Sequence, residues 1–214
     1  MSSLKVKVCG LRDAENIRSV AALEPDYLGF IFYEGSPRYV GKSFFIPDDL
    51  PSTVKSVGVF VNESAQSIQR LASLHALHAV QLHGNESVEQ CLLLKSSGLE
   101  VIKAFAVDND FDFSSLKPYQ GSVDYFLFDT RGKNYGGNGM PFNWELLNRY
   151  DLNVPFFLSG GLSNQNMQEV LKLSYKNLVA LDVNSGVETA PGVKDVQQVE
   201  QFILYTRNQL GVQK

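Results

Sequence analysis

The sequence predicts an α/β protein that folds as a single (β/α)₈ barrel, one domain over residues 1–214. Three observations favour this fold: eight short runs rich in β-branched and aromatic residues, amphipathic stretches between them, and glycine or polar clusters after most of the runs. Parallel neighbours in a sheet need a crossover connection, which a helix supplies. Because the pattern repeats eight times without a linker, closure into a barrel is favoured over an open doubly wound sheet.

The predicted strands and helices alternate along the whole chain. The strands are Lys5–Cys9, Tyr27–Phe32, Val57–Val61, Ala79–Leu82, Glu100–Phe105, Tyr125–Phe128, Pro155–Leu158 and Leu178–Leu181. Helices are predicted within residues 13–24, 62–76, 85–98, 143–150, 163–174 and 193–210, several of which begin with a capping Asn, Asp or Ser. The second and fifth connections, residues 44–53 with two prolines and residues 108–120, predict short or deformed helices.

Composition and charge narrow the class of protein. The formal net charge of −4 argues against nucleic acid as the main partner, although a local basic pocket could still hold one small phosphate. The amino terminus lacks the apolar core of a signal peptide, and no segment approaches the ~20 apolar residues that span a bilayer. We therefore expect a cytoplasmic protein without a membrane partner, in which Cys9 and Cys91 are reduced thiols.

Glycine-bearing loops after the last two strands indicate a phosphate site. Barrels of this kind often bind phosphate there, together with the start of a short extra helix. Gly160 and Gly161 allow close backbone approach to an anion, and Ser185 and Gly186 begin a run that predicts the extra helical turn. Each motif is weak alone, but on adjacent strands they predict a cradle for a phosphorylated small molecule.

A family resemblance covers nearly the whole chain. The motifs are "KVCGL", "GFIF" with "SPR", "GVFVN", "VQLHG", "FDT" with "GGNG", "LSGGL", and "LDVNSGVE" with "PGVKD". In this order, from Lys7 to Asp195, they resemble the phosphoribosylanthranilate isomerases. The resemblance implies a TIM barrel of tryptophan biosynthesis that performs an Amadori rearrangement of N-(5′-phosphoribosyl)anthranilate. It also implies a reaction without metal or organic cofactor. The sequence leaves open whether the protein is a monomer or a homodimer.

The resemblance assigns the two catalytic roles. Cys9, which ends the first strand, would be the base, and Asp129, which ends the sixth, the acid. An aminoaldose becomes an aminoketose when an acid protonates the ring oxygen and a base removes the C2′ proton from the other side of the sugar. Such a thiolate needs nearby positive charge or N–H donors, and such an aspartic acid needs desolvation to hold its proton.

The same resemblance and the residue chemistry suggest which groups bind the substrate. Arg38 would hold the anthranilate carboxylate, because a guanidinium fork matches a carboxylate. Asp182 would accept a hydrogen bond from the substrate amine or ribose, with a capping role as the alternative. Gln81 and His83 alternate on one strand and should both face the barrel mouth, where His83 either donates to the substrate or makes a structural hydrogen bond.

The loop after the sixth strand departs from the usual sequence motif of the family. Gly137 and Gly139 are retained and predict close approach to phosphate, but Asn138 stands where the family usually has Thr, which leaves a hydroxyl contact in doubt. Ser159 likewise stands where Ala is common. Neither change touches the proposed acid and base.

Three other functions remain open at this point. The related sugar isomerase of histidine biosynthesis would show an Asp at the end of the first strand and two phosphate sites related by half-barrel symmetry, whereas this chain has Cys9 and no convincing repeat. A barrel lyase such as indole-glycerol-phosphate synthase would need a catalytic lysine, for which Lys7 and Lys103 are candidates. A non-enzymatic sugar-phosphate receptor would bind without turnover, which Cys9 and Asp129 argue against.

Overall fold

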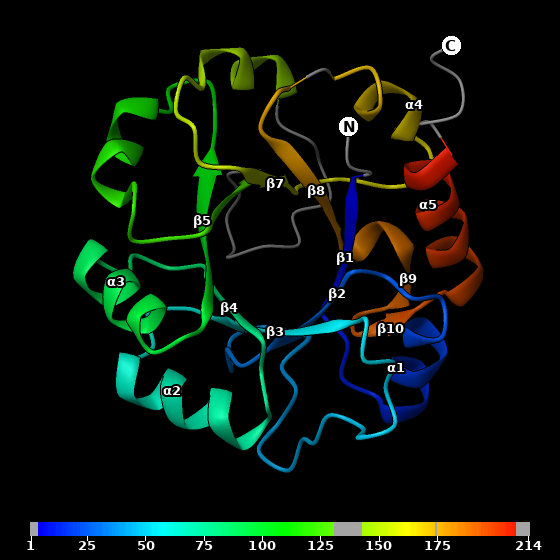
Figure 1. Ribbon diagram of the computed structural model, residues 1–214. Coiled ribbons are helices and arrows are strands. Elements are labelled where there is room, and N and C mark those ends of the chain that lie inside the picture. Colours follow the sequence, from blue (N-terminus) through cyan, green and yellow to red (C-terminus); the bar gives the residue numbers. More distant parts are fainter. Residues whose placement is uncertain (1–3, 131–142, 174, 209–214) are drawn as a thin grey trace.

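Eight parallel strands close into a barrel in the computed structural model (Figure 1). The structure describes residues 4–130, 143–173 and 175–208. Each strand pairs with the next and β8 pairs with β1, which confirms the predicted barrel. The strands are β1 (Lys5–Cys9), β2 (Tyr27–Ile31), β3 (Lys55–Phe60), β4 (Ala79–Leu82), β5 (Glu100–Val107), β6 (Tyr125–Thr130), β7 (Phe156–Leu158) and β8 (Leu178–Val183).

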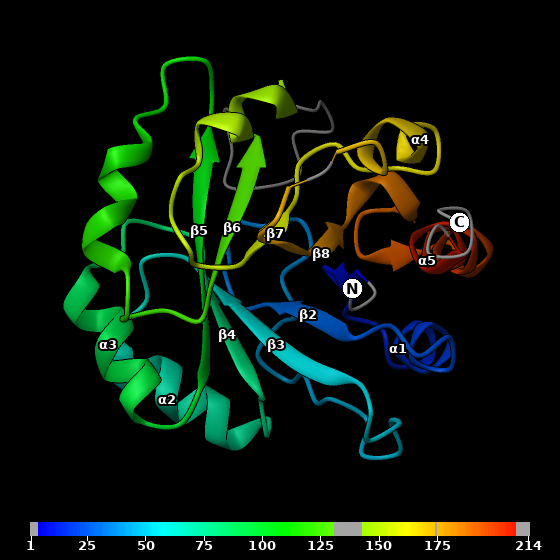
Figure 2. The ribbon, with the colours of Figure 1, turned by 45° about the horizontal axis from the view of Figure 1, so that its top comes forward.

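The helices around the barrel are less regular than the strands. The α-helices are α1 (Ala14–Ala21), α2 (Ala65–Leu74), α3 (Val88–Ser96), α4 (Met167–Val170) and α5 (Val196–Asn208). Asp13, Ser64 and Ser87 cap the first three, each accepting a hydrogen bond from a backbone N–H in the first turn. Figure 2 shows α2 and α3 covering the outer face of the barrel beside β4 and β5.

The two weak connections differ from regular helices, as predicted. The described connection between β2 and β3 contains no helix, and the connection after β5 forms the 3₁₀ helix η1 (Phe113–Tyr119), which contains Pro118. Two further predicted helices are shorter than the sequence pattern suggests. Residues 143–150 hold the 3₁₀ helix η2 (Trp144–Arg149), and residues 163–174 hold only the four-residue α4.

The barrel interior is a packed core below an open mouth. Its middle is filled by apolar side chains that include Val57, Ile102, Leu127 and Phe157. The amino-terminal end is closed by a charged pair, in which Nζ of Lys55 lies 2.8 Å from Oε2 of Glu100. The apolar side chains and the charged pair fill the middle and the amino-terminal end of the barrel. The inward-facing side chains at the carboxyl ends of the strands are therefore the ones that border the cavity.

A hairpin that the sequence did not predict follows β8. The expected extra helical turn is present as the 3₁₀ helix η3 (Ser185–Val187), and β9 (Glu188–Ala190) and β10 (Val193–Lys194) then pair antiparallel. The hairpin lies between α1 and α5 (Figure 1), where the side chain of Asn16 exchanges two 2.8 Å hydrogen bonds with the backbone of Lys194.

Among the helices of the described residues, none is long and apolar enough to cross a membrane.

Candidate active site

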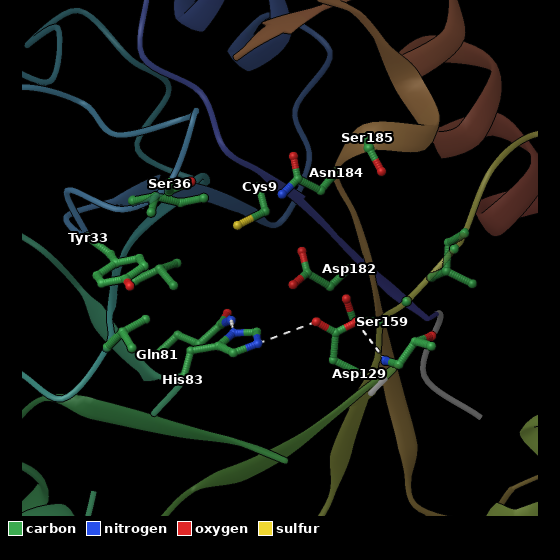
Figure 3. Close-up of a pocket in the computed structure, with 17 residues that line it drawn as sticks. Cys9, Tyr33, Ser36, Gln81, His83, Asp129, Ser159, Asp182, Asn184 and Ser185 are labelled. Atoms are coloured by element: carbon green, nitrogen blue, oxygen red, sulfur yellow. Dashed lines mark hydrogen bonds and ion pairs between the residues drawn. The ribbon is translucent and has the colours of Figure 1, made fainter. Parts of the chain in front are cut away.

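A pocket opens at the carboxyl ends of the strands. Its empty space, counted together with the open solvent at its mouth, is about 690 Å³. The pocket gathers eight of the residues that the sequence singled out, from five different strands or the loops after them, and Figure 3 shows most of them converging on one space. The predicted residues that line it are Cys9, Gln81, His83, Asp129, Gly160, Gly161, Asp182 and Ser185. Closure of the barrel is what brings together groups so far apart in the sequence.

Cys9 ends β1 with its thiol directed into the pocket (Figure 3). The thiol has room because its neighbour on β2 is Gly29, where a Cβ would lie 2.7 Å from Sγ. The next residue, Gly10, turns the chain away with a φ of +81°, a conformation that favours glycine. Burial raises the pKa of the Cys9 thiol, whereas the ammonium groups of Lys7 and Lys194 act in the opposite direction.

An ion pair lies beside Cys9 at the base of the pocket. Nζ of Lys7 is 2.8 Å from Oδ2 of Asp182, and both side chains are almost completely buried. Burial lowers the pKa of Lys7, but Asp182 and Cys9 outweigh it, so that the pKa is raised overall and the amine carries its charge. The second oxygen of Asp182, Oδ1, is buried and has no hydrogen-bond partner among the described residues. It is an acceptor left at the wall of the pocket.

Across the pocket, Asp129 contacts His83. Nε2 of His83 lies 3.3 Å from Oδ2 of Asp129, and the other carboxylate oxygen accepts the backbone N–H of Thr130 at 2.8 Å. Nε2 of Gln81 lies 2.8 Å from Nδ1 of His83, and when the amide donates there the ring proton is placed on Nε2, facing Asp129. Oε1 of Gln81 is buried and unpartnered among the described residues. Gln81 and His83 thus face the mouth as predicted, and His83 also makes a hydrogen bond within the site.

Arg38 is placed beside the pocket and is held by an acidic residue. Nε of Arg38 lies 2.9 Å from Oε1 of Glu188, and its Nη2 lies 2.7 Å from Oε2 of the same carboxylate. The side chain passes over Gly10, where a Cβ would lie 2.7 Å from Cδ of Arg38 and 2.7 Å from Oδ1 of Asn184. Arg38 itself is not among the residues that line the pocket.

The loops after β7 and β8 pack against each other at one end of the pocket. Gly160 and Gly161 have φ values of +87° and +71°, and a Cβ on Gly186 would overlap the carbonyl oxygen of Leu162. Nδ2 of Asn166 donates to the carbonyl of Gly161 at 2.8 Å and fixes the first loop. The predicted phosphate residues of these two loops therefore lie together, whereas Gly137 and Gly139 lie outside the described residues.

Of three further charged residues in this region, Glu188 and Lys194 were not predicted from the sequence, and Lys7 was named only as a candidate for the lyase alternative. Lys7 could have been recognised, because strand alternation places it on the same inward face as Cys9, whereas no local pattern marks Glu188 and Lys194. Lys103, the other lysine considered for the lyase alternative, faces away from the barrel mouth. Its Nζ lies 3.1 Å from Oε2 of the buried Glu86 and also donates to backbone carbonyls, so it is a structural ion pair behind the barrel wall.

Comparisons with known proteins agree with this geometry. The family model described as "N-(5'phosphoribosyl)anthranilate (PRA) isomerase" matches residues 6–204. An N-(5'-phosphoribosyl)anthranilate isomerase of Phocaeicola vulgatus is 45% identical over 198 residues, covering 92% of this chain and 95% of the relative. One from Parabacteroides distasonis is 43% identical over 204 residues, covering 92% of this chain and 91% of the relative.

Solved structures show the same likeness. The crystal structure of phosphoribosyl anthranilate isomerase from Thermotoga maritima superposes with a TM-score of 0.81 at 35% identity, covering 96% of this chain and 99% of that one. A second crystal structure of this kind of enzyme, in complex with reduced 1-(o-carboxyphenylamino)-1-deoxyribulose 5-phosphate, has a TM-score of 0.78 at 33% identity. It covers 96% of this chain and 99% of that one.

Proposed function

The chain belongs to the N-(5'-phosphoribosyl)anthranilate isomerase family, and from that premise we propose which of its residues perform the reaction. The enzyme catalyses the Amadori rearrangement of N-(5′-phosphoribosyl)anthranilate, an aminoaldose, to the corresponding aminoketose phosphate in tryptophan biosynthesis. The observation that carries the assignment of roles is that Cys9 and Asp129 border one pocket from β1 and β6. Groups on two such separate strands can reach opposite faces of a sugar.

Asp129 is the general acid of the ring-opening step. In its protonated form it gives its proton to the furanose ring oxygen, the C1′–O4′ bond breaks, and the nitrogen lone pair forms a C1′=N iminium. The carboxylate left on Asp129 accepts a hydrogen bond from the backbone N–H of Thr130, and its other oxygen lies 3.3 Å from Nε2 of His83. These donors stabilise the charge that develops on Asp129 as the bond breaks.

Cys9 is the general base of the second step. Its thiolate removes the proton from C2′, and the bonding electrons form a C1′=C2′ double bond while the iminium nitrogen becomes neutral. The resulting enolamine loses its C2′ hydroxyl proton and gains one at C1′, which gives the ketone. The charge of Lys7, on the same face of β1, favours the thiolate that burial disfavours.

The remaining pocket residues hold the substrate. Oδ1 of Asp182 and Oε1 of Gln81 are unpartnered acceptors among the described residues, and they suit the substrate amine or ribose hydroxyls. The loops of Gly160, Gly161, Ser185 and Gly186 would receive the phosphate, together with Gly137 and Gly139. Arg38 would bind the anthranilate carboxylate with the guanidinium atoms that Glu188 leaves available, and His83 would donate near the ring oxygen.

The same premise supports a proposal for the cellular location, partners and oligomeric state of the enzyme. A biosynthetic isomerase acting on a small phosphorylated metabolite suits the cytoplasm, and the net charge of −4 gives no reason for a nucleic acid partner. A solved relative from Thermotoga maritima is described as a dimeric enzyme from which monomers were generated. A monomer or a homodimer is accordingly the proposed assembly, which sedimentation of the purified protein would distinguish.

A turnover assay tests the function and the roles together. The purified protein should consume freshly generated phosphoribosylanthranilate, measured as loss of anthranilate-type fluorescence. Cys9→Ser and Asp129→Asn should each lower kcat by about 10²–10⁴, with KM changed far less. Cys91→Ala, in α3, is the matched control and should keep full kcat. An inactive parent protein would remove the function, and full activity in both site variants would remove the assigned roles.

A further inference from the structure

A buried charged cluster holds Arg38 beside the active site, and its central residue has no role in the chemistry described above. Its centre is Glu188, whose carboxylate accepts hydrogen bonds from Nε and Nη2 of Arg38, from the backbone N–H of Gly192 at 3.0 Å and from Nζ of Lys194 at 2.6 Å. The side chains of Arg38, Glu188 and Lys194 are exposed by only 11%, 5% and 0%. Charges buried to this degree are costly unless they are fully paired.

The cluster is fixed from several sides. Lys194 also donates to Oδ1 of Asn184 at 2.7 Å, and its backbone is held by Asn16 of α1. Burial acts to raise the pKa of Glu188, but the hydrogen bonds from Arg38 and Lys194 outweigh it and lower that pKa, so the carboxylate is ionised. The guanidinium of Arg38 is therefore held in one orientation by a rigid support.

The guanidinium nitrogens of Arg38 that bond to Glu188 show which nitrogen is left for a ligand. The bonds of Arg38 to the described residues engage Nε and Nη2, and none of them engages Nη1. We propose that Glu188 is a positioning residue, which orients the Arg38 guanidinium so that Nη1 receives the carboxylate of the substrate and so selects carboxylated substrates. The proposal rests on the assignment of Arg38 in the proposed function and extends it to a residue that does not touch the substrate.

Orientation and net charge predict opposite effects when Glu188 is neutralised. The cluster carries two cations and one anion, so Glu188→Gln raises its net charge by one. If charge alone mattered, a substrate carboxylate would bind more tightly to the variant. If Glu188 orients Arg38, the substrate carboxylate binds more weakly to the variant. The reason is that the carboxamide of the Glu188→Gln variant offers Arg38 one acceptor oxygen, whereas the native carboxylate of Glu188 offers two.

The test measures discrimination between two stable ligands. Calorimetry gives Kd for reduced 1-(o-carboxyphenylamino)-1-deoxyribulose 5-phosphate and for the matching 1-phenylamino compound, which lacks the carboxylate. The native enzyme should prefer the first by about tenfold or more, the equivalent of a charge-assisted hydrogen bond. Glu188→Gln should reduce that preference about tenfold and leave Kd for the 1-phenylamino compound within about twofold. In turnover, KM should rise more than kcat falls.

Four further variants complete the experiment. Arg38→Leu should abolish the preference, and adding Glu188→Gln to it should change nothing further, because Glu188 acts through Arg38. Glu34→Gln, the same substitution at an exposed site in the loop of Arg38, should retain the native preference. Glu188→Asp, which keeps the charge but withdraws it by one methylene, should give an intermediate preference and serves if the Gln variant fails to fold.

Each outcome decides between the alternatives. A native preference in Glu188→Gln, tighter binding of the carboxylated ligand, or an equal loss for both ligands would overturn the positioning role. If Arg38→Leu retains the preference, Arg38 does not bind the carboxylate and the inference falls with that assignment. The isomerase activity itself would stand in that case, because turnover by the native enzyme measures it separately.

Discussion

Nε2 of His83 lies 3.3 Å from Oδ2 of Asp129, so the proposed acid faces a hydrogen-bond donor inside the pocket. When Asp129 gives up its proton it becomes an anion, and Nε2–H of His83 stabilises that anion in the transition state. We expect His83→Leu to lower kcat about 10- to 100-fold, the worth of one hydrogen bond to a charged group. Calorimetry with the reduced product analogue should show nearly unchanged affinity.

The pair should behave as a unit. A double variant, His83→Leu with Asp129→Asn, is expected to be no slower than Asp129→Asn alone, because the histidine acts on the charge of the acid. His75→Leu is the control, since His75 packs against Phe32 with ring centroids 5.1 Å apart and is not among the residues that line the pocket. Multiplicative losses in the double variant would mean that His83 acts on the substrate independently.

A second prediction concerns the pH dependence of the base. Burial raises the pKa of Cys9 and Lys7 opposes that effect, so removal of the Lys7 charge should raise the thiol pKa further. Because the proposed base, Cys9, would work as the thiolate, the acidic limb of the kcat/KM profile of Lys7→Met should move to higher pH, by about one to three units. The pH dependence of Cys9 alkylation by iodoacetamide, in a Cys91→Ala background, measures the same shift directly.

The partner of Lys7 supplies the control for this experiment. Lys7→Met leaves the buried Asp182 without its cation, and any negative charge on Asp182 acts to raise the pKa of Cys9. Adding Asp182→Asn removes that contribution, so the limb of the double variant should lie between those of the native enzyme and the single variant. An unchanged limb in Lys7→Met would show that the lysine has only a structural role.

Much of this enzyme can be predicted from its sequence because the information is local. Strand alternation and the polar residues after each strand are enough to place Cys9, Gln81, Asp129 and Asp182 at one rim of the barrel. The sequence pattern predicts longer helices at α4 and at the 3₁₀ helix η2, because amphipathic spacing does not show where packing ends a helix.

The charged cluster around Glu188 could not be predicted in this way. Arg38 and Glu188 form an ion pair although they are 150 positions apart in the sequence, and Lys194 and Glu188 are six positions apart. Such contacts depend on how a hairpin packs against the second loop of the barrel, which no local pattern encodes. Lys7 was recognisable as an inward-facing residue, but its pairing with Asp182 required the closure of β8 onto β1.

A third prediction concerns Lys103, one of the two lysines considered for the lyase alternative. Lys103→Met leaves the carboxylate of Glu86 buried without its cation and should lower the free energy of unfolding by about 3–5 kcal/mol, measured by urea denaturation. The kcat of the protein that remains folded should be native, because Lys103 lies behind the barrel wall. Loss of kcat without loss of stability would instead indicate a role for Lys103 in the chemistry, as the lyase alternative requires.

The last prediction concerns the space that Cys9 occupies. Gly29, its neighbour on β2, has no side chain, and a Cβ there would lie 2.7 Å from Sγ and 3.1 Å from Cα of Cys9. Gly29→Ala therefore has to displace the thiol. Since misplacement by about 1 Å can cost 100-fold in rate, kcat should fall about 10- to 100-fold while the reduced product analogue still binds.

Gly58→Ala on β3 is the matched control for this crowding. Its Cβ would point to the outside of the barrel and meet side-chain ends of Leu77 at 2.5 Å and Phe60 at 2.7 Å. Both variants should lose stability through overpacking, by about 1–3 kcal/mol each, but Gly58→Ala should keep its kcat. If Gly29→Ala is as active as Gly58→Ala, the position of the thiol at the end of β1 does not limit the rate. A selective loss in Gly29→Ala places the base at Cys9 without altering that residue.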